Sequence, residues 1–274
     1  MVKKKKQKDR GGFFWKLLFI IALGVFVFSG YQLFAIYQGY KAGVDEYEAV
    51  AEEVTTKMQS QEPLVAIDQK VPQEGTVLFF EEVTYQPPEV DFEELQKMNP
   101  DVIGWIEVEA LPEISYPIVQ GEDNDFYLHR TFKKASNNAG SIFVDYRNGQ
   151  YFGDCNTIIY GHNMKNGSMF GKLKWLTEKE QYKESKYIWI CTPTAKYRYE
   201  IFSIQHVQAI SDTYTFYSEH NEEFAAYLQN MQKKSEVDFH TEQLSKDDFV
   251  ITLSTCTSND EVRYVVQARW IATY

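Results

Sequence analysis

The chain has 274 residues and a formal net charge of −11, which allows one large domain or two small ones. The acidic balance argues against nucleic acid as a partner, because phosphate contacts need clustered Lys and Arg. Three cysteines, Cys155, Cys191 and Cys256, are too few for a scaffold built on disulfides, although a bridge between Cys155 and Cys191 stays open. The sequence contains no phosphate-binding loop and no histidine pair at metal-ligand spacing, so neither a cofactor nor a metal is expected.

The N-terminus combines a basic tip with a long apolar run. Residues 1–16 hold seven Lys or Arg residues against Asp9, a local charge of +6, and residues 17–37 carry no charge at all. Twenty-one uncharged residues, most of them apolar, can cross a bilayer as a helix, and the preceding lysines fit the positive-inside rule. We therefore expect a cytoplasmic tip, an uncleaved single-pass anchor at 17–37 and a body outside the cytoplasm. A cleaved signal peptide is the alternative.

The next segment, residues 38–90, reads as a stalk and a linker. Residues 44–61 are acidic and favour a helix, whereas residues 62–90 contain four prolines and predict an extended tether, with one candidate strand at 76–80. The folded body is expected to span residues 91–274.

The body alternates short apolar runs with turns, which predicts a mainly β fold. Eight strands are expected, at 102–108, 115–119, 141–144, 157–160, 187–192, 196–209, 249–255 and 262–272. Helices are expected at 92–98, 168–176 and 218–234, the last with an apolar stripe at helical spacing. So many strands with few helices between them favour a closed or nearly closed barrel.

Three side chains could carry chemistry together. Cys256 ends a strand, a polar turn follows, and the next strand returns Arg263 beside it across a hairpin. A thiolate is a strong nucleophile when a nearby positive charge lowers its pKa, and a guanidinium is always charged. His162 follows a glycine at another strand end and could carry protons. Arg269 lies on the same strand as Arg263 but about 20 Å away, so it is the weaker candidate.

Several segments, in their order along the chain, resemble one enzyme family. They are "YPIVQGEDNDFYLHRTF", "AGSIFVDYRN", "IIYGHNM", "FGKLKWL" and "TLSTC" followed by "RYVV". Over residues 93–274 the chain resembles the sortases, the cysteine transpeptidases of Gram-positive bacteria, and more narrowly class B. The resemblance implies an eight-stranded sortase-like barrel with a longer helix between strands 6 and 7, the feature that separates class B from class A.

The resemblance also implies an activity. Cys256 would attack the carbonyl of a threonine in the C-terminal sorting signal of a secreted surface protein and form a thioacyl-enzyme. His162 would protonate the leaving amine and deprotonate the incoming one, and Arg263 would hold the developing oxyanion. The acceptor would be an amine of a peptidoglycan precursor, lipid II, and the enzyme would act at the cell membrane. An acid that follows the cysteine in some relatives is replaced here by Thr257, so its role is absent or falls to Asp260.

The resemblance extends to the substrate groove. The matching positions are Asn124, Leu128, Tyr160 and Ser254, and, with a less certain alignment, Thr213 and Tyr217. Plain packing or turn chemistry is an equal alternative for each of them. Two other functions stay open for the whole chain. A secreted cysteine peptidase would hydrolyse the same intermediate, and an inactive membrane-anchored binding module would form none.

Overall fold

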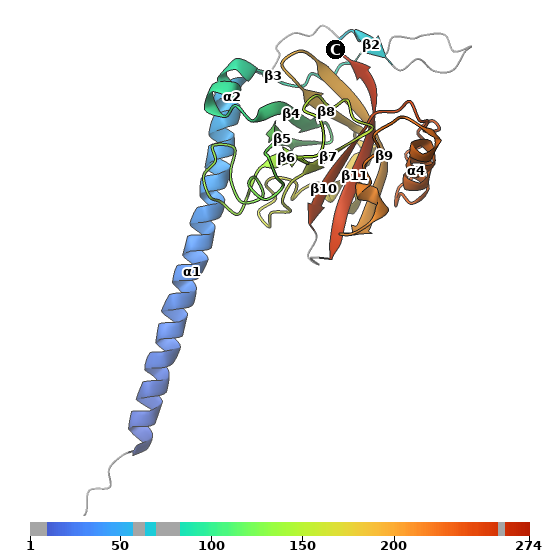
Figure 1. The fold of residues 1–274 in the computed structure, drawn as a ribbon. Coiled ribbons are helices and arrows are strands. Elements are labelled where there is room, and N and C mark those ends of the chain that lie inside the picture. The colour runs from blue at the N-terminus through green and yellow to red at the C-terminus, as the bar shows by residue number, and fades with distance from the viewer. Residues whose placement is uncertain (1–9, 57–63, 70–82, 257–260) are drawn as a thin grey trace, which may run out of the picture. The chain divides into compact units, whose positions relative to one another are not determined.

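The computed structural model describes residues 10–56, 64–69, 83–256 and 261–274 (Figure 1). The candidate strand at 76–80, the basic residues before Arg10 and the turn at 257–260 lie outside the described residues. The chain divides into two compact units, Met1–Ala42 and Gly43–Tyr274, and each is described by itself.

The first unit consists of the larger part of helix α1 (Arg10–Val54). This helix is long and apolar enough to cross a membrane, with a mean hydropathy of 2.2 in its most apolar window and no buried share there. Its large apolar side chains from Phe14 to Tyr37 are exposed. A helix of this kind fits the expected span at 17–37, and a signal sequence has the same properties.

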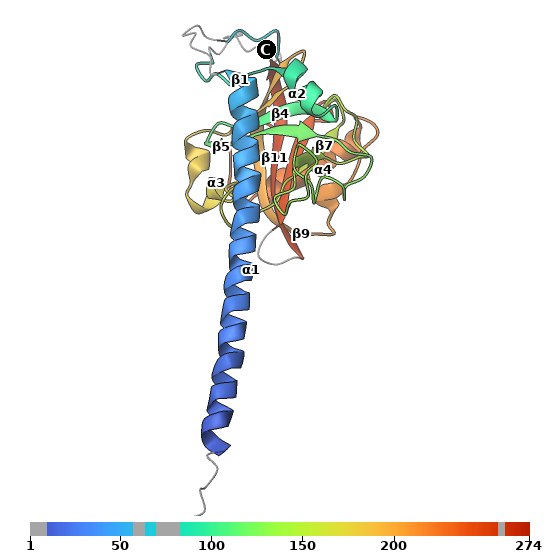
Figure 2. The same cartoon turned by 90° about the vertical axis from the view of Figure 1, so that its left-hand side faces the viewer.

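The second unit is built on a closed barrel of eight strands. They are β4 (Val102–Val108), β5 (Leu111–Val119), β6 (Ile142–Val144), β7 (Asn156–Tyr160), β8 (Tyr187–Cys191), β9 (Lys196–Gln208), β10 (Val250–Cys256) and β11 (Val262–Thr273). The strand order is β10-β7-β6-β5-β4-β8-β9-β11, and the pairing of β10 with β11, both labelled in Figure 1, closes the barrel. Figure 2 shows the same fold turned by 90°. The predicted mainly β fold with eight barrel strands is confirmed.

Three two-residue strands complete the sheets. Strand β2 (Asp68–Gln69) extends the barrel sheet beyond β11, and β1 (Thr55–Thr56) pairs with β3 (Glu89–Val90). Helix α2 (Phe92–Met98) has the predicted bounds. Asp91 caps it by accepting a hydrogen bond from the Glu94 amide.

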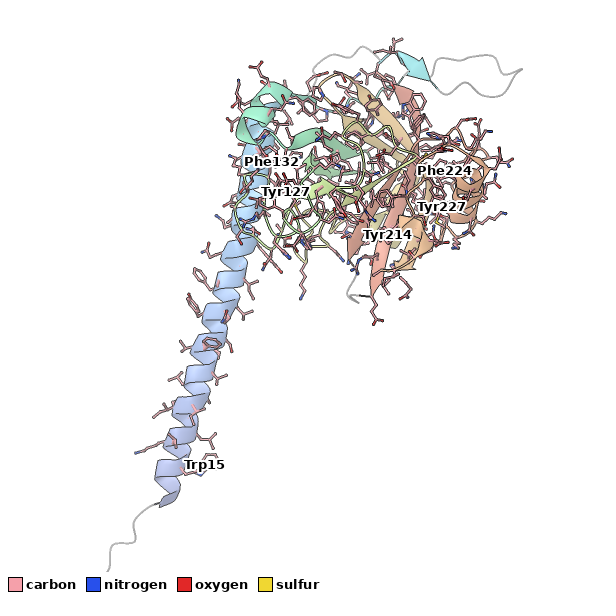
Figure 3. All side chains as sticks on the ribbon, in the orientation of Figure 1. Trp15, Tyr127, Phe132, Tyr214, Phe224 and Tyr227 are labelled. Atoms are coloured by element: carbon pink, nitrogen blue, oxygen red, sulfur yellow. The ribbon has the colours of Figure 1, made fainter. Side chains whose placement is uncertain are left out.

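A longer helix, α4 (Glu222–Lys233), lies between β9 and β10, the sixth and seventh barrel strands, as predicted (Figure 1). It starts four residues later than expected because Asn221 caps it through the Phe224 amide. Its apolar stripe packs on the barrel in a cluster with Phe202 of β9 and Val250 of β10. Figure 3 labels two members of this stripe, Phe224 and Tyr227.

The helix expected at 168–176 is wrong in its bounds. Residues 168–174 form turns with hydrogen bonds from residue i to i−3, and α3 covers only Trp175–Glu178. Met169 has φ +55°, which a helix cannot contain. A short 3₁₀ helix, η1 (Gln181–Lys183), follows α3, and a second, η2 (Asp212–Tyr214), precedes α4.

The compact body begins at Gly43 rather than near Asp91. Tyr47, Val50 and Val54, on the last turns of α1, are buried. Their spacing of three and four residues forms an apolar stripe among many acidic residues, so composition alone suggested a stalk. The residues just after the expected span are therefore part of the body that holds the candidate site.

Candidate functional site

The candidate site lies where two neighbouring parallel strands end. Strands β7 and β10 are paired in register, with Tyr160 opposite Ser254. The pairing continues past β7, because the amide of Gly161 donates to the carbonyl oxygen of Ser254 (3.1 Å). Parallel strands end at the same edge of a sheet, so His162 and the end of β10 meet there.

The hairpin of β10 and β11 brings the other two candidates together. Cys256, the last residue of β10, is the register partner of Arg263. Arg269 is the partner of Val250 at the opposite end of β10, where its guanidinium donates to Glu200 Oε2 at 2.8 and 3.0 Å. The register therefore supports Arg263, and not Arg269, as the neighbour of Cys256.

A cavity of about 240 Å³ joins most of the candidate residues. Six of the residues singled out from the sequence line it: Asn124, Leu128, Tyr160, His162, Ser254 and Arg263. A second cavity of about 390 Å³ shares three of them and is bounded on its other side by Arg147, Tyr214 and residues 209–211. The two cavities form one groove at the strand ends, which we call the donor groove.

His162 is held in the donor groove by the loop that carries Leu128. Its Nε2 atom lies 2.7 Å from the Leu128 carbonyl oxygen. Gly140 allows this approach, because it has φ +58° and a Cβ there would lie 2.9 Å from His162 Cδ2. Burial lowers the pKa of His162 below its usual 6.5, although the hydrogen bond to Leu128 opposes that shift.

One buried carboxylate, that of Asp145, accepts hydrogen bonds from side chains that line the donor groove. Asp145 accepts hydrogen bonds from Asn124 Nδ2 (2.9 Å), from the Tyr160 hydroxyl (3.0 Å) and from the guanidinium of Arg147 (2.8 and 2.9 Å). Burial alone would raise the pKa of Asp145, but the hydrogen bonds from Arg147, Asn124 and Tyr160 outweigh it and lower that pKa. An ionised Asp145 thus holds three groove-lining side chains, those of Asn124, Arg147 and Tyr160.

The end of α1 holds the loop that in turn holds His162. The Tyr47 hydroxyl accepts from the Phe132 amide (3.0 Å) and donates to the Gly140 carbonyl oxygen (2.7 Å). Both partners belong to residues 127–141, the segment that includes Leu128. Figure 3 labels Phe132 beside α1.

A second side chain of α1 forms hydrogen bonds with the same loop. The Glu46 carboxylate accepts from the Thr131 hydroxyl and from the Lys133 amide, both at 2.9 Å. We call Glu46 and Tyr47, together with Thr131, Phe132, Lys133 and Gly140, the helix clamp. It connects the C-terminal part of α1 to the segment whose Leu128 carbonyl oxygen contacts His162.

Two of the sequence candidates lie outside the donor groove. Thr213 is 1% exposed and its hydroxyl faces the sulfur of Met231 (3.8 Å). Tyr217 packs against the rings of Phe224 and Tyr227. Both belong to the packing under α4, so the structure favours the packing alternative for them.

Cys155 and Cys191 are both free and buried, so they are not bridged to each other. Burial raises the pKa of both thiols, that of Cys191 to about 12. Neither is a reactive thiol of the kind expected at Cys256.

Sequence reasoning missed Asp145 and Tyr214. The Tyr214 hydroxyl lies 2.7 Å from Ser254 Oγ and its ring stacks on Tyr160, so it forms one side of the donor groove. Tyr214 is adjacent to Thr213 in a loop whose alignment was uncertain. Asp145 stands inside the quoted segment "AGSIFVDYRN", and an aspartate directly after a buried strand was the available signal.

Comparisons with known proteins agree on the family. A family model described as the sortase domain matches residues 106–271. Sortase B of Listeria monocytogenes (serovar 1/2a, strain EGD-e) is 34% identical over 268 residues, covering 94% of this chain and 97% of the relative. Sortase B of Staphylococcus aureus (strain NCTC 8325) is 31% identical over 183 residues, 66% of this chain and 74% of the relative.

Comparisons with solved structures indicate the same family. The crystal structure of sortase B from Bacillus anthracis in complex with AAEK1 superposes with a TM-score of 0.67 at 30% identity, covering 86% of this chain and all of that one. The sortase B structure from Listeria monocytogenes has a TM-score of 0.57 at 39% identity, covering 65% and 99%. This chain therefore belongs to the sortase family of cysteine transpeptidases, and within it to class B.

Proposed function

We propose that this sortase cleaves a C-terminal sorting signal of secreted proteins after a threonine and transfers them to an amine of a peptidoglycan precursor. The observation that carries the proposal is the donor groove, which gathers His162, Arg263 and Ser254 at the strand end that carries Cys256. An extended peptide lying in this groove would present a carbonyl to that strand end.

The chemistry proceeds in two halves. The Cys256 sulfur attacks the threonine carbonyl carbon, a C–S bond forms, and the C–N bond breaks as His162 gives a proton to the leaving amine. In the second half the acceptor nitrogen attacks the thioester, the C–S bond breaks, and His162 takes the proton of the attacking amine. Arg263 supplies a fixed positive charge for the oxyanion in both halves.

The backbone contact of His162 selects which ring nitrogen would move the proton. A carbonyl oxygen can only accept, so Nε2 carries a hydrogen in the bond to Leu128. Nδ1 is then the nitrogen that exchanges a proton with the reacting groups. Asn124, Leu128, Tyr160 and Ser254 are the proposed peptide contacts, whereas Thr213 and Tyr217 would act on the groove only through packing.

Product analysis tests this function against its two alternatives. An Asn-Pro-x-Thr-type peptide is incubated with the protein, with and without an amine acceptor. The transpeptidase forms the peptide–amine product when acceptor is present. A cysteine peptidase would release only the free acid, and a binding module would leave the peptide intact.

The location of the enzyme is part of the proposal. We propose that residues 17–37 anchor it in the cell membrane as a single span, with residues 1–16 in the cytoplasm and the body outside. The apolar exposed surface of α1 supports this. A reporter fused after Tyr274 should be active only outside the cytoplasm, and the mature protein should keep Lys3–Lys6. An N-terminus produced by cleavage between residues 30 and 50 would contradict the anchor.

A further inference from the structure

Helix α4 does not line the donor groove, although the segment before it does. Among the described residues that line the two cavities of the groove, none belongs to α4. Any influence of this helix on a peptide in the groove must therefore pass through another segment. That segment is η2, whose last residue, Tyr214, lines the groove.

A buried hydroxyl joins α4 to η2. Tyr227 of α4 donates a hydrogen bond to the carbonyl oxygen of Thr213 (2.9 Å). The same hydroxyl oxygen accepts from Gln267 Nε2 of β11 (2.9 Å), and this nitrogen also donates to Thr252 Oγ1 of β10 (3.1 Å). Tyr227 and Thr213 are both buried, and a buried carbonyl oxygen that loses its donor is costly. The Tyr227 hydroxyl therefore fixes η2 relative to two barrel strands.

An exposed ion pair also joins η2 to the end of α4. Lys234 Nζ lies 3.0 Å from Asp212 Oδ2, and about half of each side chain is exposed. Solvent and salt weaken such pairs, so they contribute little to holding a segment in place. The position of η2 thus depends more on the buried Tyr227 hydroxyl than on this ion pair.

On the groove side, η2 places Tyr214 against Ser254. The two hydroxyl oxygens lie 2.7 Å apart, and the Tyr214 ring stacks on Tyr160. A serine hydroxyl has one hydrogen and two lone pairs. A hydrogen bond donated by Tyr214 uses one lone pair of Ser254 Oγ and leaves the Ser254 hydrogen for another acceptor. Ser254 lines both cavities of the groove, so that acceptor can be a carbonyl oxygen of a bound peptide.

We propose that Tyr227 and Tyr214 are positioning residues for the donor peptide. Through the Thr213 carbonyl, Tyr227 holds η2 where the Tyr214 hydroxyl donates to Ser254 Oγ, and Ser254 then donates to a backbone carbonyl oxygen of the peptide. The helix that lies outside the groove in this way controls how tightly an extended peptide binds inside it. The proposal rests on the proposed function, because the peptide is the sorting signal of that reaction.

A double-mutant cycle tests the contact between Tyr214 and Ser254. Tyr214→Phe and Ser254→Ala should each raise the KM for an Asn-Pro-x-Thr-type peptide about fivefold, the effect of one hydrogen bond, and change kcat less than about twofold. The double variant should also show about a fivefold increase, because Ser254→Ala removes the hydroxyl through which Tyr214 acts. An increase of about 25-fold would mean two independent contacts and would overturn the proposal.

A binding measurement removes catalysis from the comparison. In a Cys256→Ala background, calorimetry with the same peptide should give dissociation constants that change by the same factors as the KM values. Dissociation constants that stay the same in Tyr214→Phe and Ser254→Ala would show that neither residue acts on peptide binding, which would overturn the proposal.

Tyr227→Phe extends the cycle to α4. It should raise the KM about threefold in the parent, and less than about 1.5-fold in the Tyr214→Phe background, where its effect has no route to Ser254. The matched control is Tyr85→Phe, which removes a tyrosine hydroxyl bound to Glu107 elsewhere on the barrel. Both variants should lower the melting temperature, but only Tyr227→Phe should change the KM.

The outcomes separate this proposal from the function on which it rests. Peptide cleavage with an unchanged KM in Tyr227→Phe, or with equal KM increases in Tyr227→Phe and Tyr85→Phe, would overturn the positioning role alone. No peptide cleavage by the parent enzyme would overturn the proposed function as well.

Discussion

The Nε2 atom of His162 lies 2.7 Å from the carbonyl oxygen of Leu128, and this contact sets both the position and the protonation of the ring. The carbonyl fixes the hydrogen on Nε2, while burial disfavours the charged imidazolium. His162 is therefore neutral at pH values above its lowered pKa, and Nδ1 is the ring nitrogen that the Leu128 contact leaves available. The acid role proposed for His162 requires that the ring take up a proton during the reaction cycle.

The first prediction concerns the pH at which His162 titrates. Its pKa in the folded protein lies below the 6.5 of an unfolded chain, so the unfolded state binds protons more readily between these two values. The stability that neutral His162 contributes is complete above about pH 6.5 and decreases as the pH falls toward the folded pKa.

Nitrogen NMR of the imidazole against pH measures this directly. The His162 midpoint should lie below 6.5, and His162→Asn should flatten the pH dependence of the free energy of unfolding in that window. A midpoint at or above 6.5 would show that the hydrogen bond to Leu128 outweighs burial.

The second prediction concerns the helix clamp. Tyr47→Phe removes the hydroxyl that joins Phe132 to Gly140, so residues 127–141 should loosen and Leu128 should hold His162 less firmly. We expect kcat to fall about tenfold while the KM for the sorting peptide changes little, since small displacements of catalytic groups are costly. The His162 imidazole resonances should also shift.

Tyr85→Phe is the matched control. Tyr85 also hydrogen-bonds through its hydroxyl, to Glu107, but it contacts a different part of the barrel. If both variants lose activity equally and the His162 resonances stay in place, Tyr47 acts on stability alone.

The third prediction separates the two arginines of β11. Arg263→Lys should lower kcat/KM for the sorting peptide at least about tenfold, because an ammonium cannot replace a two-pronged donor. Arg269→Lys should leave kcat/KM nearly unchanged and reduce the free energy of unfolding instead. Its guanidinium is buried and makes two hydrogen bonds to Glu200, and the ammonium of a lysine keeps the charge but cannot reproduce this two-pronged contact. Steady-state kinetics and urea denaturation of both variants give the comparison. A loss of kcat/KM in Arg269→Lys would mean that Arg269, and not Arg263, lies beside the reacting groups.

Much of the fold was readable because its signals are local. The strand at 187–191 is a continuous apolar run, the strand at 102–108 is apolar except at Gly104 and Glu107, and α4 has a clear apolar stripe at helical spacing. The pairing of Cys256 with Arg263 could be predicted because only six residues separate them along the chain, between two consecutive strand patterns.

The remaining features depend on contacts between distant segments. Tyr47 and Gly140 are 93 residues apart. The acidic composition around Tyr47 does not indicate which residue its hydroxyl will hydrogen-bond. The role of Asp145 is visible only in the folded structure, where Asn124 and Tyr160 donate hydrogen bonds to its carboxylate. Within the 3₁₀ helix η2, Thr213 is buried whereas its neighbour Tyr214 lines the donor groove, a difference that the sequence does not indicate.

The measurement that tests the account most directly is the intact mass of the protein after incubation with a sorting peptide. We predict one acyl adduct, located by peptide mapping on Cys256, and its loss in Cys256→Ala, together with a decrease in peptide cleavage of about a thousandfold or more. The Cys256→Ala variant should keep the melting temperature of the parent. Cys155 and Cys191 should stay unmodified, because both are buried and their pKa values are raised. An adduct on either of those residues, or cleavage that persists in Cys256→Ala, would contradict the assignment of the nucleophile.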